Sequence, residues 1–187
     1  MRRRAHHRPE RKPIFVGCEG ASEVSYIAFI SDLAKTARLP VSIKPVALRE
    51  GDPLTRVEKA IRLINDNRKK RIDYAERFIL MDSDQIALAP DRAEQAKLLA
   101  IENRISIIWQ DPCHEALLLR HFAGHATKLP GTAAASTKQL IKQWPGYKKA
   151  MSKRDIAKLL TLESVSHAAA GQQELKSFLI FIGLVTN

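Results

Sequence analysis

The sequence has only two cysteines, Cys18 and Cys113, and both lie in apolar contexts. A disulfide framework is therefore not expected, and the reducing cytosol is the expected compartment. No run of about 18 apolar residues occurs, so we expect no membrane-spanning helix. The basic N-terminal segment has no apolar stretch that could serve as a secretory signal. The phosphate-binding loop GxxxxGK[S/T] is also missing, so we do not expect this chain to hydrolyse ATP.

Acidic residues are scarce relative to basic ones. The 20 Asp and Glu residues stand against 31 Lys and Arg residues, which gives a formal net charge of +11. This excess favours a polyanionic partner, most often nucleic acid, but an ordinary solvated surface explains it equally well. The candidate nucleic-acid contacts form two clusters, one of Arg68, Lys69, Lys70 and Arg71 and the other of Lys148 and Lys149.

Short apolar runs alternate with helix-like periodicity along most of the chain. Strands are expected at 14–18, 41–48, 78–81 and 105–109, and helices at 91–102, 136–144, 152–162 and 172–184, among others. This alternation predicts an α/β fold with a mostly parallel four-stranded sheet flanked by helices. We divide the chain into a basic disordered tail at 1–12, an α/β core at 13–125, and a helical C-terminal extension packed on that core at 126–187.

Acidic side chains follow three of the predicted strands. Glu19 follows the first, Asp82 and Asp84 follow the third, and Asp111 and Glu115 follow the fourth. The carboxyl ends of parallel strands meet at one edge of a sheet, where ligands bind. Clustered carboxylates repel one another unless a cation such as Mg²⁺ or Mn²⁺ lies among them. Acids within a basic surface predict a metal-dependent nuclease. Alternatively, the Asp-Ser-Asp stretch is only a turn and helix-cap cluster.

Three stretches also carry a resemblance to a known family: GCEGASEVSYI at 17–27, LMDSD at 80–84 and WQDPCHEALLLRHF at 109–122. The first two resemble the TOPRIM domain of topoisomerases, primases and OLD-type nucleases. The third makes the match narrower, because it is similar to the RloB family of TOPRIM-related proteins. That family is associated with bacterial restriction and anti-phage defence loci. The resemblance implies a TOPRIM-like fold and a nuclease that acts in anti-phage defence or abortive infection.

The same resemblance implies roles for the matching acids. Glu19 would be the general acid or base and would also lie near the metal, while Asp82 and Asp84 would bind Mg²⁺ or Mn²⁺. Glu115 would be an additional catalytic acid. Residues that would lie next to this site are Glu23, Asp111 and His121. By analogy with OLD-like systems, a separate ATPase subunit would supply any ATP hydrolysis.

Two other functions fit the same residues. A non-catalytic TOPRIM-like module would bind nucleic acid or a protein partner, and its acids would be structural. A metal-dependent nucleotide-sugar transferase would use LMDSDQIALAP at 80–90, which resembles the strand and DxD motif of such enzymes. The transferase ranks low, because enzymes of that kind usually open with a strand that leads into a nucleotide pocket and are larger than this chain.

Overall fold

The α/β fold predicted from the sequence is confirmed by a computed structural model that describes residues 11–49 and 51–186. Most of the tail predicted at 1–12 lies outside the described residues, and Lys12 already belongs to the first strand. The sheet and the helices between its strands are β1 (Lys12–Cys18), α1 (Ala21–Thr36), β2 (Val41–Ala47), α2 (Pro53–Lys69), β3 (Glu76–Asp82), α3 (Asp84–Leu88), α4 (Pro90–Glu102) and β4 (Ser106–Gln110).

All strand pairings in the four-stranded sheet are parallel, and the strand order is β2-β1-β3-β4. The two central strands, β1 and β3, each contain a continuous buried apolar run, as strands covered by helices on both faces require. Pro45 has no N–H to donate and lies in β2, which is an edge strand, as its position in the sequence predicts. The carboxyl ends of β1 and β3 therefore lie side by side at the middle of one edge of the sheet.

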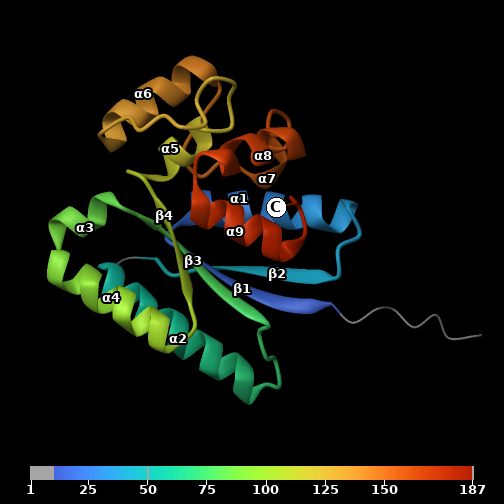
Figure 1. The fold of residues 1–187 in the computed structure, drawn as a ribbon, viewed down its shortest axis with the longest axis vertical. Helices are drawn as coiled ribbons and strands as arrows, with labels where there is room; N and C mark the ends of the chain where they lie inside the picture. The colour runs from blue at the N-terminus through green and yellow to red at the C-terminus, as the bar shows by residue number, and fades with distance from the viewer. Residues whose placement is uncertain (1–10, 50, 187) are drawn as a thin grey trace, which may run out of the picture.

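Alternate residues of the central strands enter two separate apolar layers. Ile14, Val16 and Leu80 pack toward α1, whereas Phe15 and Ile79 pack toward α2 and α4. Figure 1 shows α2 and α4 on one side of the sheet and α1 on the other, together with helices from the C-terminal part of the chain.

The C-terminal helices belong to the same core as the sheet. They are α5 (His114–Leu119), α6 (Ala133–Gln143), α7 (Lys153–Ile156), α8 (Leu162–Ala170) and α9 (Gln173–Ile182). The ring of Phe178 in α9 meets that of Phe78 in β3 edge to face, with centroids 4.9 Å apart. Leu140 and Val165 are fully buried in the layer that also holds α1. The helices after β4 thus cover one face of the sheet.

Two differences from the predicted elements concern short helices. A five-residue helix, α3, follows the DxD stretch directly, and the segment predicted as one helix at 152–162 is instead the short α7 followed by a turn. None of the helices in the described ranges combines the length and the hydropathy that a membrane span requires.

Candidate active site

Two of the predicted site residues are joined directly at the middle of the sheet edge. Glu19 follows β1, and Asp82 is the last residue of the neighbouring β3. The backbone N–H of Asp82 donates a hydrogen bond to Glu19 Oε2 over 3.2 Å, across a sequence separation of 63 residues. The parallel pairing of β1 with β3 brings these positions together because both strands end at the same edge.

A buried arginine that the sequence did not single out holds the other oxygen of Glu19. Arg56 Nη2 lies 2.8 Å from Glu19 Oε1, and Arg56 Nε donates to the carbonyl of Arg49 over 3.2 Å. Arg56 is only 6% exposed, and its Nη1 is buried without a hydrogen-bond partner among the described residues. It lies in the first turns of α2, whose start follows the carboxyl end of β2. Helical periodicity places Arg56 in α2 but does not show which residue it meets, so no local sequence pattern could have found it.

The carboxyl group of Asp82 lies among acids without a compensating partner. Its Oδ1 is buried and accepts no hydrogen bond within the described part of the chain. Burial, together with the negative charges of Glu19, Glu23, Asp84 and Glu115, raises the pKa of Asp82 to about 8. Burial also raises the pKa of Glu19, and the positive charge of Arg56 opposes this shift. The sheet edge is therefore short of positive charge at Asp82.

The residues at this edge fit a hard divalent cation in chemistry, but not as a closed cage. In residues 11–49 and 51–186, no three His, Cys, Asp or Glu side chains converge closely enough to hold a metal ion. Mg²⁺ is usually held by one or two carboxylates and keeps waters for the substrate phosphates. Asp82 offers an unpaired carboxylate oxygen, and Asp84 lies two residues further on at the start of α3. These two acids would hold the ion, and Glu19 could join them on leaving Arg56.

Backbone hydrogen bonds fix the Asp-Ser-Asp turn against the end of β4. The N–H of Ser83 donates to the carbonyl of Gln110 over 3.0 Å, and the N–H of Asp84 donates to that of Pro112 over 3.1 Å. The hydroxyl of Ser83 also donates to Asp111 Oδ1 over 3.0 Å. Asp111 therefore supports the turn from an exposed position, and the turn presents its acids on a rigid backbone.

Glu115 and Glu23 are both buried, and each accepts a hydrogen bond. Glu115 Oε1 accepts from the Tyr147 hydroxyl over 3.0 Å, and Lys149 Nζ lies 3.9 Å away. Burial alone would raise the pKa of Glu115, but hydrogen bonds from its own backbone N–H and from Tyr147 hold it below the usual value. Glu23 accepts from the Gly20 N–H over 3.0 Å at the start of α1. Glu115 thus stays ionised near the site, and Glu23 caps a helix.

His121 lies in the interior beneath α5 and not at the sheet edge. Its Nδ1 donates to the carbonyl of Leu117 over 3.0 Å, so its Nε2 accepts from the Tyr26 hydroxyl over 3.1 Å. Burial lowers the pKa of His121 to about 4, so the imidazole is neutral at physiological pH. These contacts give His121 a packing role.

The two basic clusters lie in different places. Lys148 and Lys149 are exposed, and Lys149 Nζ lies 3.9 Å from Glu115 Oε1. The cluster at 68–71 lies at the C-terminal end of α2. A helix of 17 residues is about 25 Å long, so the cluster is about that far from the start of α2. Of the two clusters, it is the one at 148–149 that the structure places beside a candidate acid, through Lys149.

A family model described as RloB-like protein matches residues 14–177. The chain belongs to the RloB-like family. The match extends past the stretches at 17–122 that suggested it and includes α5 to α8 and part of α9. Comparisons with curated proteins and with solved structures give no match.

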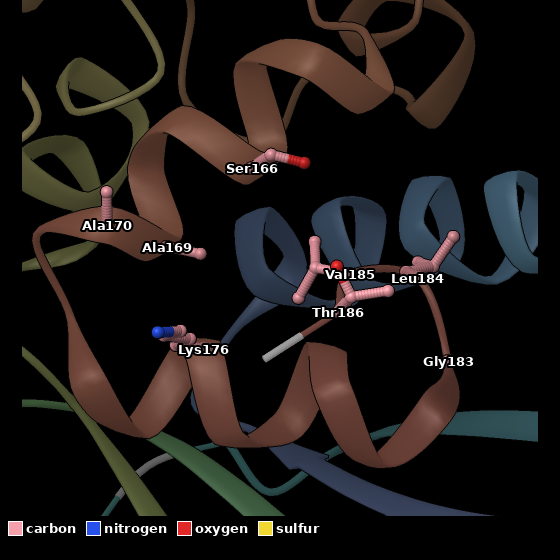
Figure 2. Close-up of a pocket in the computed structure, with 8 residues that line it drawn as sticks. All are labelled: Ser166, Ala169, Ala170, Lys176, Gly183, Leu184, Val185 and Thr186. Carbon is pink, nitrogen blue, oxygen red and sulfur yellow. The ribbon is translucent and has the colours of Figure 1, made fainter.

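This RloB-like protein also has a hollow of about 460 Å³ away from the acids. It lies between α8 and α9 and is bordered by residues 183–186, as Figure 2 shows. Its lining includes Lys176 and Ser166 among small apolar side chains, but none of the candidate site residues. We place the candidate site at the sheet edge because the acids and the unpaired oxygen of Asp82 gather there.

Proposed function

We propose that this RloB-like protein is a metal-dependent phosphodiesterase that cleaves nucleic acid at the edge formed by Glu19, Asp82 and Asp84. The observation that carries the proposal is the buried, unpaired Oδ1 of Asp82, next to a Glu19 that is bonded to the same residue's backbone. A buried carboxylate oxygen without a donor is costly unless a cation binds it. The family's association with anti-phage defence supports a role in that process.

Each residue has a distinct part in this function. Asp82 and Asp84 hold Mg²⁺ or Mn²⁺, which when bound offsets charge at the scissile phosphate and lowers the pKa of bound water. Glu19 accepts or returns a proton, and Glu115 stabilises the cationic side chains beside it. Lys148 and Lys149 position the phosphate backbone by charge. A separate ATPase subunit remains part of the proposal, since the sequence has no phosphate-binding loop.

Cleavage by purified protein tests this function. The protein is incubated with single- and double-stranded DNA and RNA in Mg²⁺, Mn²⁺ or EDTA, alongside Glu19→Gln and Asp82→Asn. We expect cleavage only with metal and a loss of at least about 100-fold in both variants. Asp73→Asn, an exposed acid near the start of β3, is the matched control and should cleave normally. Cleavage that persists in EDTA or in Asp82→Asn contradicts the proposal.

A non-catalytic binding module is the second candidate, and one observation favours it. Both oxygens of Glu19 are already occupied, by Arg56 and by the Asp82 N–H, as in a structural ion pair. This function predicts nucleic-acid affinity that falls with rising salt, and no products with any metal. Fluorescence anisotropy across a salt series, run beside the cleavage assay, separates the two candidates.

A further inference from the structure

A second hollow, of about 650 Å³, lies beside the Asp-Ser-Asp turn at the outer edge of β4. One of its walls comes from α3 and α4, through Ile86 and Lys97. The opposite wall comes from the start of α9, through Gln173. Ser83, which lies between Asp82 and Asp84, lines the hollow as well. The hollow therefore borders the turn that carries Asp82 and Asp84, although neither acid lines it.

A buried guanidinium without a carboxylate partner lies at this hollow. Arg120 is 2% exposed, and its three hydrogen bonds go to neutral oxygens: Gln172 Oε1 over 3.1 Å and the carbonyls of Asp111 over 2.6 Å and Lys128 over 3.4 Å. Asp111 and Glu174 also line the hollow, and their charges act on Arg120 through space and oppose the lowering of its pKa by burial, but neither carboxylate comes within 4.0 Å of it as an ion pair. Burying a charge without a counter-charge is costly. An anionic ligand in the hollow would give Arg120 a counter-charge at contact distance.

The remaining lining suits a nucleotide. Trp109, at the end of the edge strand β4, is partly buried and offers an aromatic surface of the kind on which bases stack. Lys97 adds a second cation, and its only ion pair among the described residues is an exposed one with Glu94 at 3.2 Å. Such a pair is weak and does not hold the amine away from a phosphate. The side chain of Gln172 bridges Arg120 and the Trp109 carbonyl, which fixes both groups.

We propose that this hollow binds one nucleotide unit of a nucleic-acid strand, with the base against Trp109 and the phosphate between Lys97 and Arg120. This proposal rests on the proposed function, because the bound nucleotide matters for cleavage only if the next phosphodiester along the strand reaches Asp82 and Asp84. Binding itself needs no metal, since the residues that contact the nucleotide are different from the acids proposed to hold the metal. The hollow is thus the subsite that sets the register of the strand.

Fluorine NMR on the full chain tests this site. The chain has two tryptophans, Trp109 and Trp144, and both are labelled with 5-fluorotryptophan. Titration with AMP in EDTA should shift the Trp109 signal saturably and leave that of Trp144, which is buried among C-terminal helices, in place. The signals are assigned with Trp109→Phe. Absence of a saturable Trp109 shift overturns the proposal.

Two comparisons test the phosphate contact. Adenosine, which lacks the phosphate, should bind at least about 10-fold more weakly than AMP, and Lys97→Ala should weaken AMP about 5-fold. Lys35→Ala is the matched control, because Lys35 is also paired with an acid three residues earlier in an exposed helix. It should bind AMP normally. Equal affinities for AMP and adenosine, or for Lys97→Ala and the wild type, contradict the proposal.

The two proposals fail separately. Asp82→Asn should bind AMP like the wild type while losing cleavage, and Lys97→Ala should raise KM for an oligonucleotide with little change in kcat. Metal-dependent cleavage without AMP binding rejects the subsite alone. AMP binding by a protein that cleaves nothing with any metal rejects the catalytic function alone.

Discussion

At the scale of single residues, Arg56 controls the state of Glu19. Its ion pair is largely buried, with side-chain exposures of 7% for Arg56 and 18% for Glu19. Removing one partner of a buried pair leaves the other charge uncompensated. Without a bound metal, Arg56 therefore supplies a positive charge next to the acids at this edge of the sheet.

Replacing Arg56 should destabilise the metal-free protein and increase its affinity for metal. We expect Arg56→Gln to lower the free energy of unfolding by about 3 kcal/mol, because Glu19 loses its counter-charge. Mg²⁺ should restore part of this loss. Urea denaturation with Mg²⁺ or EDTA measures both effects. Arg92→Gln, which breaks the more exposed pair with Asp52, should cost less than about 1 kcal/mol. Equal losses in the two variants contradict this role.

His121 should make the fold sensitive to acid. Its pKa of about 4 lies below the usual value of 6.5, so the unfolded chain binds this proton more tightly than the folded one. Its contribution to stability is complete above pH 6.5 and is lost as the pH falls toward 4, by about 3 kcal/mol. His121→Gln removes this titration. The difference in unfolding free energy between wild type and variant should therefore shrink on acidification, and a difference independent of pH contradicts the assignment.

The residues of the candidate site were predictable to different degrees. Glu19, Asp82 and Asp84 could be expected to gather because each follows an apolar strand, and parallel strands end at one edge. Arg56 could not, because its helical periodicity gives no sign of which residue it meets at the neighbouring strand. The interior place of His121 depends on contacts with α1, which no local pattern records.

At the scale of elements, the turn between α8 and α9 depends on a glycine. A Cβ at Gly171 would collide with the backbone carbonyl of Ala126, which is not a flexible group. Gly171 also lines the hollow beside β4, so the close approach sets the position of the α9 start. Backbone contacts of this kind admit only glycine.

Gly171→Ala should therefore destabilise the protein. We expect a loss of about 2 kcal/mol in the free energy of unfolding, because the α8–α9 turn must move away from residue 126. Thermal and urea denaturation measure it. Gly146→Ala is the matched control: a Cβ there has no neighbour closer than 3.9 Å, so the change should stay within about 0.5 kcal/mol. A harmless Gly171→Ala would mean that the turn adjusts freely.

Strands were easier to predict than the short helices. The apolar runs at 14–18 and 78–81 fall inside β1 and β3, because strands buried on both faces need continuous apolar sequence. The helix α3 was missed because five residues give too little periodicity to recognise. The segment 152–162 looked like one helix, but its first turn ends early at Ile156 and a new helix begins at Leu162 after a Thr161 cap.

At the scale of the whole molecule, positive charge is divided between the two ends of the sheet. Lys148 and Lys149 lie at the end that carries the acids, and the cluster at 68–71 lies at the other end of α2. The parallel direction of the strands puts the cluster at 68–71 away from the acids, because α2 starts at the carboxyl edge of the sheet after β2 and ends at the opposite edge. The net charge of +11 alone does not reveal it.

The two ends should contribute unequally to nucleic-acid binding at the candidate active site. The double variant Lys148→Ala/Lys149→Ala should weaken binding of a short oligonucleotide and lower the salt dependence by about 2 in the logarithmic slope, since two phosphate contacts are lost. The double variant Arg68→Ala/Lys69→Ala should change the affinity and its salt dependence less. Fluorescence anisotropy with an oligonucleotide of about eight nucleotides across a salt series measures the affinity and the slope. A larger effect at 68–69 would place the strand at the opposite end of the molecule.

Direct titration with Mn²⁺ tests the central claim, that the acids at the ends of β1 and β3 hold a metal ion. Calorimetry is performed on the wild type, Asp82→Asn and the control Asp73→Asn, without nucleic acid. The account predicts one ion per chain for the wild type and the control, and an affinity lower by on the order of tenfold or more for Asp82→Asn. Equal Mn²⁺ affinity in Asp82→Asn and the wild type, or no binding to the wild type at millimolar Mn²⁺, would contradict it.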